Sequence, residues 1–359
     1  MSAASAAAAA SSTAIPVPST TPAVTTSSNT STTATGTGSC FPFSGTLPSD
    51  FSAPPASRSD WWCAQNDMYG FLGFSYPLEV ADCSDPSNSY ESINADFAKM
   101  KKDFGASMIR VYAPECREAS VWENLLQAGV SNDMGIIVQV WWGFDSDQDL
   151  WKQTQSSIYS VMTNPKYSAI APFVFHSAEF GSEPIGDGVD GNNFISDLAA
   201  FRSKMNGYGI PVAISEDWDR PGTMSSSDGS GLGDTGKQVK ANSDMLHGHP
   251  MPFYHNKNEA ESWDYVAGQV QWYKDNVGLP TFVTETQWAW GKGGDHGDGV
   301  GDVGPTQYSN YWHNFDDNCA LFKQYQTGWF IHAWSMESTF AMVKDDGSYA
   351  MSAWKPQRC

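Results

Sequence analysis

The segment PTFVTETQWAWG at residues 280–291 begins as a short apolar run with β-branched residues and ends in a carboxylate, two tryptophans and a glycine. An apolar, β-branched run of this kind predicts a buried strand. Glu285 then stands at the carboxyl end of that strand. In a parallel barrel this end opens to solvent and carries the chemistry. The segment therefore predicts a barrel strand with a functional carboxylate, whose partner should come from another strand.

The chain after residue 66 alternates between strand-like and helix-like patterns. Strands are predicted near residues 69–76, 107–112, 136–142, 172–183, 210–215, 245–251 and 328–334, and helices at 92–104, 119–129, 150–162, 194–205, 259–276 and 308–325. With the segment at 280–291, this alternation predicts an α/β fold, the (β/α)8 TIM barrel. The alternative is an open doubly wound sheet. That fold needs a glycine-rich phosphate loop after the first strand, and Ser75-Tyr76-Pro77-Leu78 supplies none.

Charge and composition restrict the class of ligand. The 359-residue chain has a net charge of −20, which repels nucleic acid and suits neutral ligands. It contains 15 Trp, 14 Tyr and 19 Phe, rings that either stack on sugars or fill a large core. No apolar stretch is long enough to span a membrane. We therefore expect a neutral ligand and neither nucleic acid nor a bilayer as partner. We also expect a monomer.

The six cysteines indicate an oxidising compartment. They are Cys40, Cys63, Cys83, Cys116, Cys319 and Cys359. None forms a CxxC pair, which argues against a zinc site. An even number spread along the chain fits three disulfides, and six free buried thiols are the alternative. Spacing alone leaves the pairing open among 15 connectivities.

The chain divides into three predicted parts. Residues 1–38 are rich in Ser, Thr and Ala, contain the sequon Asn29-Thr30-Ser31, and predict a disordered, glycosylated stalk. Residues 39–66 predict an ordered lead-in packed on the barrel, and residues 67–359 the catalytic barrel. The run Ala6–Ala10 is no convincing signal peptide, because it lacks a basic region and a leucine-like core. The stalk and the cysteines nevertheless predict an extracellular protein.

Two strand ends carry glutamates that could act together. Glu183 follows the predicted fourth strand and Glu285 the seventh. Across the mouth of a barrel, two such carboxylates can lie about 5–5.5 Å apart, the separation of a retaining glycosidase. One must be protonated to donate to the leaving oxygen, and the other ionised to attack the anomeric carbon. The alternative for each alone is a solvated carboxylate at the rim.

Other motifs lie at the same strand ends. Six tryptophans there either form sugar platforms or cap the barrel core: Trp141, Trp142, Trp218, Trp288, Trp290 and Trp334. His247 and His249 form an HxH pair that fits a sugar hydroxyl contact better than a metal site, because no Cys or Glu ligand is near in sequence. The Gly/Asp-rich loops at 186–191 and 294–299 lack the full EF-hand pattern. We therefore expect no metal and no cofactor.

From about residue 69 onward, the chain resembles glycoside hydrolase family 17, the β-1,3-glucanases and glucanosyltransferases of plant and fungal walls. The motifs that carry the resemblance are Gly73–Pro77, Ile109–Tyr112, Phe180–Glu183, Ser215–Trp218, His249–Pro250 and Thr284–Trp288. The resemblance implies that Glu183 is the acid/base and Glu285 the nucleophile. It also implies a Cys83–Cys116 disulfide and leaves the other four cysteines unassigned. The substrate contacts that we expect are Tyr76, Arg110, Tyr112, Trp142, Ser182, Trp218, His249, Trp288 and Trp334.

Three departures from the family pattern stand close to these residues. Ser182 replaces the asparagine that precedes the acid/base, and Gln287 and Ala289 replace a glycine and a proline around Trp288. His332 stands where the eighth strand of the family has a carboxylate. These changes leave the general mechanism intact and affect linkage preference and subsite shape.

The function that we predict is retaining hydrolysis of β-1,3-glucan, of the glucan endo-1,3-β-glucosidase type, in fungal cell-wall metabolism. A β-1,6-glucanase or a β-glucanosyltransferase is the alternative within the same class. A non-catalytic wall protein that binds glucan through its tryptophans is the alternative from another class, motivated by Ser182 and His332.

Overall fold

The computed structural model describes residues 40–51, 54–55, 57–141, 143–144, 149–292 and 302–359. The predicted stalk at residues 1–38, Trp142 and the loop at 294–299 lie outside the described residues. The chain clusters into two units, residues 1–38 and 39–359, and the fold described below belongs to the second.

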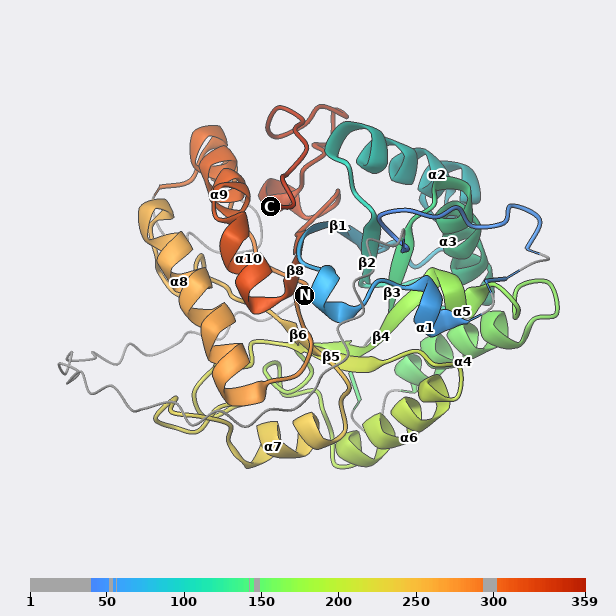
Figure 1. Ribbon diagram of the computed structural model, residues 1–359, viewed down its shortest axis with the longest axis horizontal. Coiled ribbons are helices and arrows are strands. Elements are labelled where there is room, and N and C mark those ends of the chain that lie inside the picture. The colour runs from blue at the N-terminus through green and yellow to red at the C-terminus, as the bar shows by residue number, and fades with distance from the viewer. Residues whose placement is uncertain (1–39, 52–53, 56, 142, 145–148, 293–301) are drawn as a thin grey trace, which may run out of the picture. The chain divides into compact units, whose positions relative to one another are not determined.

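Eight parallel strands close into a barrel in chain order (Figure 1). They are β1 (Gly70–Pro77), β2 (Met108–Tyr112), β3 (Gly135–Val140), β4 (Phe175–Ser182), β5 (Val212–Glu216), β6 (Leu246–Gly248), β7 (Thr281–Val283) and β8 (Thr327–Ile331). β8 pairs back with β1, so that the sheet has no free edge. The predicted (β/α)8 barrel is therefore confirmed.

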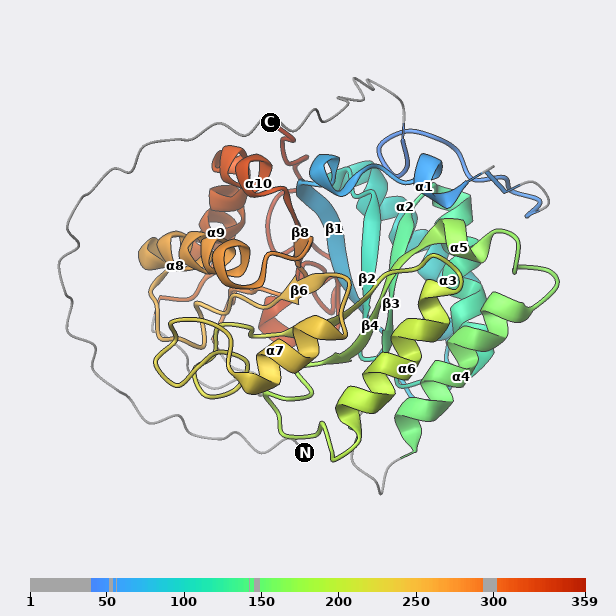
Figure 2. The ribbon, with the colours of Figure 1, turned by 60° about the horizontal axis from the view of Figure 1, so that its bottom comes forward.

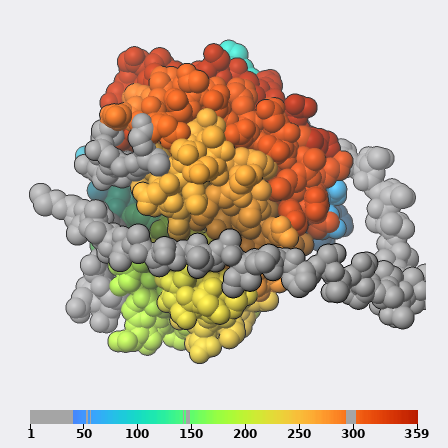
Figure 3. Space-filling view, turned by 90° about the vertical axis from the view of Figure 1, so that its left-hand side faces the viewer, coloured from blue at the N-terminus to red at the C-terminus, as the bar shows by residue number. Residues whose placement is uncertain are grey.

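Helices surround the strands. They are α1 (Arg58–Trp61), α2 (Tyr90–Lys99), α3 (Ala119–Asn132), α4 (Leu150–Thr163), α5 (Ala171–Val174), α6 (Phe194–Asn206), α7 (Asp234–Ala241), α8 (Glu259–Trp272), α9 (Pro305–Asp317) and α10 (Cys319–Tyr325). Figure 2 shows α3, α4 and α6 on one side of β1–β4, and α8, α9 and α10 on the other. Figure 3 shows the surface of α8 continuing into that of α9 and α10. The helices thus cover the outer faces of the strands.

Some boundaries differ from the sequence-based expectation. The helix predicted at 308–325 is interrupted at Asn318, whose side chain donates to the Asn314 carbonyl at 2.8 Å. Residues 172–174, expected as strand, belong to the short helix α5. The polar helix α7 was not predicted, because its sequence lacks an apolar stripe of helical period. Single π-helical turns at Met100–Phe104 and Tyr273–Val277 extend α2 and α8.

The interior of the barrel is lined by packed rings at its amino end and by hydrogen-bonded polar groups toward its carboxyl end. At the amino end, Trp62 packs against His176 and His176 against Phe282, with ring centroids 4.7 and 5.3 Å apart. Higher up, the strands turn polar side chains inward, all of them fully buried: Ser75, Arg110, Gln139, Glu179, Ser215 and His247. A charged layer inside a core is costly unless every group is paired. It therefore marks the end of the barrel where a site is built.

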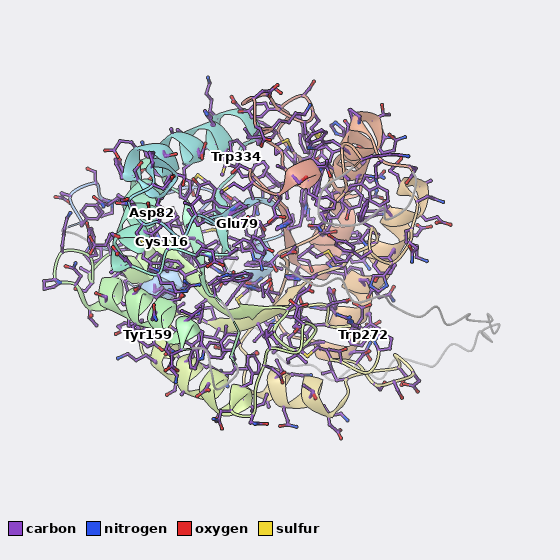
Figure 4. All side chains as sticks on the ribbon, turned by 180° about the vertical axis from the view of Figure 1, so that it is seen from behind. Glu79, Asp82, Cys116, Tyr159, Trp272 and Trp334 are labelled. Atoms are coloured by element: carbon purple, nitrogen blue, oxygen red, sulfur yellow. A yellow bond between two sulfur atoms is a disulfide. The ribbon has the colours of Figure 1, made fainter. Side chains whose placement is uncertain are left out.

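Three disulfides are present, Cys40–Cys63, Cys83–Cys116 and Cys319–Cys359. Cys83–Cys116 is the pairing that the resemblance implies. Figure 4 shows Cys116 on the same side of the molecule as Glu79 and Trp334. Among the described residues, no helix is both long and apolar enough to cross a membrane.

Candidate active site

The structure brings the two predicted glutamates together at the carboxyl ends of the strands. Glu183 directly follows β4, and Glu285 lies two residues after β7. One carboxylate oxygen of each, and one ring nitrogen of His249, lie within 4.8 Å of one another. This spacing fits the short carboxylate separation of retaining glycosidases better than the separation of about 6.5–9.5 Å in inverting ones.

The backbone around Glu183 is fixed in an unusual conformation. Glu183 has a φ of +48°, in the left-handed region that side-chain-bearing residues rarely occupy. Its N–H donates to the Ser215 carbonyl at 2.7 Å. The carboxylate of Glu216 accepts the N–H groups of Ile185 and Gly186 at 2.8 and 3.0 Å. The strain at Glu183 is therefore held by β5 and aims its carboxylate into the mouth of the barrel.

Arg110 is the hub of the polar layer. Its Nε donates to both carboxylate oxygens of Glu179, at 3.1 and 2.9 Å, and its Nη1 donates to Glu285 at 2.8 Å. The remaining N–H groups reach three serine hydroxyls, Ser75 at 3.4 Å, Ser182 at 3.0 Å and Ser215 at 2.9 Å. All five donors of the guanidinium are thus used within the protein. One buried cation orients the nucleophile candidate from below.

Glu179 is the buried counter-charge of Arg110, and sequence reasoning missed it. Burial raises the pKa of Glu179, but Arg110, His247 and Gln139 outweigh burial and lower it to about 2. His247 Nδ1 lies 2.8 Å from one carboxylate oxygen and Gln139 Nε2 2.5 Å from the other. A glutamate inside an apolar strand, four residues before Glu183, was the signal that could have found it, because even spacings share a side of a strand.

His249 links the two catalytic candidates. Its Nδ1 lies 2.7 Å from Glu183 Oε1, and its Nε2 bonds the Ser215 hydroxyl and lies 3.7 Å from Glu285 Oε2. Burial lowers the pKa of His249, but the two carboxylates, Glu285 foremost, raise it above the ordinary value. Glu183, His249 and Glu285 also have the spacing of metal ligands. Both nitrogens of His249 are already engaged, which favours a hydrogen-bonded network over metal coordination.

Glu285 lies beside one guanidinium, that of Arg110, and two imidazoles, those of His249 and His332. Burial raises its pKa, but His332, His249 and Arg110 outweigh burial and lower the pKa below the ordinary value. The carboxylate is therefore ionised at neutral and mildly acidic pH. An ionised, desolvated carboxylate at the mouth of a barrel can attack an electrophilic carbon.

The carboxylate of Glu337, in the segment after β8, lies near His332. His332 Nε2 lies 3.9 Å from Glu285 Oε1 and 3.8 Å from Glu337 Oε2. Burial, followed by a hydrogen bond to Glu337, raises the pKa of Glu79 to about 8. Glu79 and Glu337 therefore share a proton near neutral pH (Glu79 is labelled in Figure 4). Through Glu337, this acid pair lies near the same ring nitrogen of His332 that Glu285 approaches.

Two expected substrate contacts lie at the mouth with part of their surface open. Tyr112 is partly exposed, with Arg110 5.3 Å and Trp141 5.5 Å from its ring. Ser182 is also partly exposed and accepts a hydrogen bond from Arg110. Both therefore stay candidates for a direct contact with a ligand.

Three tryptophans that we expected to contact substrate belong to the core. Trp218 donates its indole N–H to the His247 carbonyl at 3.1 Å, Trp288 stacks on Tyr311 at 5.4 Å, and Trp334 packs edge-on against Phe74 at 5.0 Å. None of the three is more than 1% exposed, so no ring face is open to a sugar. The expectation of sugar platforms at these positions is wrong in this structure, because the rings fill the layer between strands and helices.

Three further expected contacts are also buried. Tyr76 points outward from β1, because its neighbour Ser75 points inward, and its hydroxyl donates to Asp96 on α2 at 3.1 Å. Arg110 and His249 have no exposed surface and use their polar atoms within the protein. These two position the carboxylates and do not face solvent, which corrects their expected role.

A partly exposed aromatic residue at the mouth was missed. Tyr254, in the loop between β6 and α8, is 43% exposed. Its hydroxyl accepts a hydrogen bond from Gln287 Nε2 at 2.8 Å. No periodicity marks a loop residue of this kind, so no sequence pattern could have found it.

No model of a known protein family matches the chain, and no curated protein matches it in sequence. Solved structures do resemble it. One is an active-site mutant of the β-1,3-glucanosyltransferase of Rhizomucor miehei in complex with laminaritriose, with a TM-score of 0.59 and 16% identity over 80% of this chain and 98% of that one. Another is the glycoside hydrolase family 17 β-1,3-glucanosyltransferase of the same organism, with a TM-score of 0.57 and 18% identity over 78% and 95% of the two chains.

The chain also resembles barrels that form only part of longer proteins. A family 2 β-galacturonidase from Eisenbergiella tayi has a TM-score of 0.53 and 14% identity over 78% of this chain and 49% of that one. At these identities the likeness shows the fold, a barrel of the kind that glycoside hydrolases and transferases use. The chemistry is argued below from the residues of this chain.

Proposed function

We propose that this chain is a retaining glycosidase that acts on β-glucan. The observation that carries the proposal is the Glu183–Glu285 pair, with carboxylate oxygens within 4.8 Å at the carboxyl ends of two barrel strands. The lowered pKa of Glu285 supports a nucleophile, and the strained, partly exposed Glu183 supports a proton donor beside it.

The reaction proceeds in two displacements. Glu285 attacks the anomeric carbon while protonated Glu183 donates its proton to the leaving glycosidic oxygen, which breaks the bond and forms a glycosyl ester on Glu285. Glu183, now a carboxylate, removes a proton from water, and the water oxygen displaces Glu285. Arg110 holds Glu285 in place at 2.8 Å, and His249 holds Glu183 at 2.7 Å.

A neutral sugar is the substrate class that the site favours. Arg110 donates its N–H groups to acceptors of the protein, so none is free to bind the carboxylate of a uronic acid. Glu183, Glu285 and Glu337 would repel such a group. The resemblance to family 17 and the likeness to a barrel solved with laminaritriose support β-1,3-glucan, with endo action as the finer proposal.

Transglycosylation is the second candidate. It is favoured by the names of the two similar Rhizomucor structures, both glucanosyltransferases. In that reaction a sugar hydroxyl takes the place of water in the second displacement. A β-1,6-glucanase and a non-catalytic glucan-binding protein are the other outcomes that the tests below distinguish.

We also propose an extracellular, wall-associated, monomeric protein with a stalk at residues 1–38 and a catalytic barrel at 67–359. The three disulfides support an oxidising compartment. Trp62 packs against His176 of the barrel, and the Cys40–Cys63 bridge joins the two ends of the lead-in to each other, which supports an ordered lead-in.

The first test is product analysis. Wild type, Glu183→Gln and Glu285→Gln are incubated with laminarin and with a β-1,6-glucan, and the products are separated by chromatography. We expect short β-1,3-oligosaccharides from wild type and a loss of about 10²–10⁴-fold in each variant. Glu91→Gln, an exposed glutamate on α2, is the control. Full activity in either active-site variant would remove that residue from the mechanism.

The two roles are separated by azide rescue on an activated β-laminaribioside. Azide should restore turnover of Glu285→Gly with an α-glycosyl azide, because it attacks the sugar face that the nucleophile vacates. Azide should restore turnover of Glu183→Ala and give a β-glycosyl azide, because it displaces Glu285 from the glycosyl ester. Products longer than the substrate indicate transglycosylation, and glucan binding without any new reducing ends indicates the non-catalytic alternative.

A further inference from the structure

We propose that Tyr254, held in position by Gln287, forms one wall of a sugar subsite beside Glu285. The inference rests on the proposed function and adds a binding residue to it. Tyr254 and Met336 are the two exposed large apolar side chains of the described residues, each 43% exposed. Tyr254 lies in the loop that leaves β6, whose neighbour in the barrel is β7. The exposed ring thus belongs to the end of the barrel that carries both glutamates.

The segment after β7 turns alternate side chains to opposite sides. Thr286 and Trp288 both contact Tyr311 of α9, by a hydrogen bond and by ring stacking. Glu285 contacts Arg110 inside the barrel, on the other side. Gln287 is two residues from Glu285 and bonds Tyr254 at the mouth. Gln287 and Glu285 therefore share the side that faces the mouth.

Gln287 is a buried amide whose hydrogen bond goes to an exposed ring. It is 4% exposed, and its Nε2 donates to the Tyr254 hydroxyl at 2.8 Å. Its Oε1 is buried without a hydrogen-bond partner in the described part of the chain. The oxygen and the nitrogen of a buried amide normally both have hydrogen-bond partners. The unpaired oxygen of Gln287 therefore costs free energy, while its nitrogen holds the Tyr254 ring. The ring of Tyr254 also packs edge-on against Phe253, with centroids 5.4 Å apart, and lies near Phe340, with centroids 6.3 Å apart.

The hydroxyl of Tyr254 lies within the field of the catalytic pair. Burial, followed by the charges of Glu285 and Glu337, raises the pKa of Tyr254 above its ordinary value, and Glu183 contributes in the same direction. The hydroxyl is therefore protonated at any working pH and can donate to a sugar oxygen. The partly exposed ring offers an apolar face to the C–H groups of a pyranose.

Gln287 is thereby a positioning residue. Its hydrogen bond to the Tyr254 hydroxyl holds the ring at the mouth, where the ring can face a neutral sugar unit. A charged sugar is disfavoured at this wall, because the nearby carboxylates repel anions.

Binding of laminarihexaose to Glu183→Gln protein, measured by calorimetry, tests the proposal. In that background we expect Tyr254→Ala to raise Kd about tenfold and Tyr254→Phe about threefold. Gln287→Ala should also raise Kd about threefold, but should add nothing once Tyr254 is alanine, because its effect acts through the ring. Tyr208→Ala, in the turn before β5 at the other end of the barrel, is the matched control.

Kinetics of the single variants in the active enzyme give a second readout. We expect KM for laminarihexaose to rise while kcat changes less than twofold, because Tyr254 binds the sugar and does not take part in bond cleavage. An unchanged Kd in Tyr254→Ala, or an equal loss in Tyr208→Ala, would overturn the inference. If the unsubstituted parent binds no hexaose, the proposed function fails and not merely the subsite.

Discussion

At the scale of single residues, the site depends on one buried cation. Arg110 joins Glu179 and Glu285, and its five N–H groups leave no donor free. Removing one partner of such a buried network leaves uncompensated charge. The direction of Glu285 is therefore set by Arg110, and its lowered pKa by His332, His249 and Arg110 together.

Replacing Arg110 by lysine tests this dependence. A lysine ammonium cannot reproduce the planar fork, so Glu285 loses orientation and part of its stabilising charge. Its pKa should rise, which moves the acidic limb of the kcat/KM profile to higher pH and lowers the maximum by about 10²-fold or more. The measurement is a pH–rate profile with circular dichroism to confirm folding. The control is Arg202→Lys, because Arg202 forms a partly exposed ion pair with Asp244. An acidic limb that does not move in Arg110→Lys would contradict the role of Arg110.

At the scale of elements, the loops that leave β6 and β7 carry Tyr254 and Gln287, the two residues of the proposed sugar wall. Pro250 accepts a hydrogen bond from Thr286, so the two loops are tied together. The loop after β6 ends at a capping box, in which Asn258 accepts from the Glu261 N–H and Glu261 accepts from the Asn258 N–H. The first turn of α8 thus fixes the far end of the loop that holds Tyr254.

Asn258→Ala is expected to destabilise the protein by about 1 kcal/mol, since it removes the N-cap of α8. The measurement is the free energy of unfolding in urea. Asn258→Asp should retain most of the stability, because aspartate also caps helices. A loss above about 3 kcal/mol would mean that the residue does more than cap the helix.

At the scale of the whole molecule, buried carboxylates couple stability to pH in opposite directions. Burial, followed by the charge of Glu183, raises the pKa of Glu216 to about 8. Burial and Asp217 raise the pKa of Asp219 to about 9. The folded state holds these protons while the unfolded chain releases them, so stability falls as pH rises from the ordinary carboxyl range toward 8. Glu179, with its pKa near 2, acts in the other direction, and its contribution is lost only in strong acid.

We therefore expect the melting temperature to be higher near pH 5 than near pH 8. Glu216 alone can contribute a slope on the order of 1 kcal/mol per pH unit across this window. Glu216→Gln keeps an oxygen for the N–H groups of Ile185 and Gly186 but cannot ionise, so its melting temperature should fall less between the two pH values. Thermal scans of wild type, Glu216→Gln and the exposed control Glu91→Gln check this. Parallel curves for the first two would contradict it.

Much of the fold could be predicted because alternating strands and helices leave a local signal. The barrel and the placement of Glu183 and Glu285 at strand ends follow from apolar runs and their last residues. Trp218, Trp288 and Trp334 could not be assigned in the same way. A tryptophan next to a strand end faces either the mouth or the helices, and one residue of register decides which.

The sequence by itself determined the barrel, the acidic, aromatic-rich composition and the two glutamates at strand ends, because these depend on local periodicity. Only the tertiary structure decided that Arg110 binds both Glu179 and Glu285, that His249 lies between the two catalytic candidates, and that Gln287 holds Tyr254. Each of these contacts joins strands or loops far apart in the chain, and closure of the barrel and the irregular register near Ser182 bring them together. Local pattern carries no information about such distances, so the geometry of the site came from the fold.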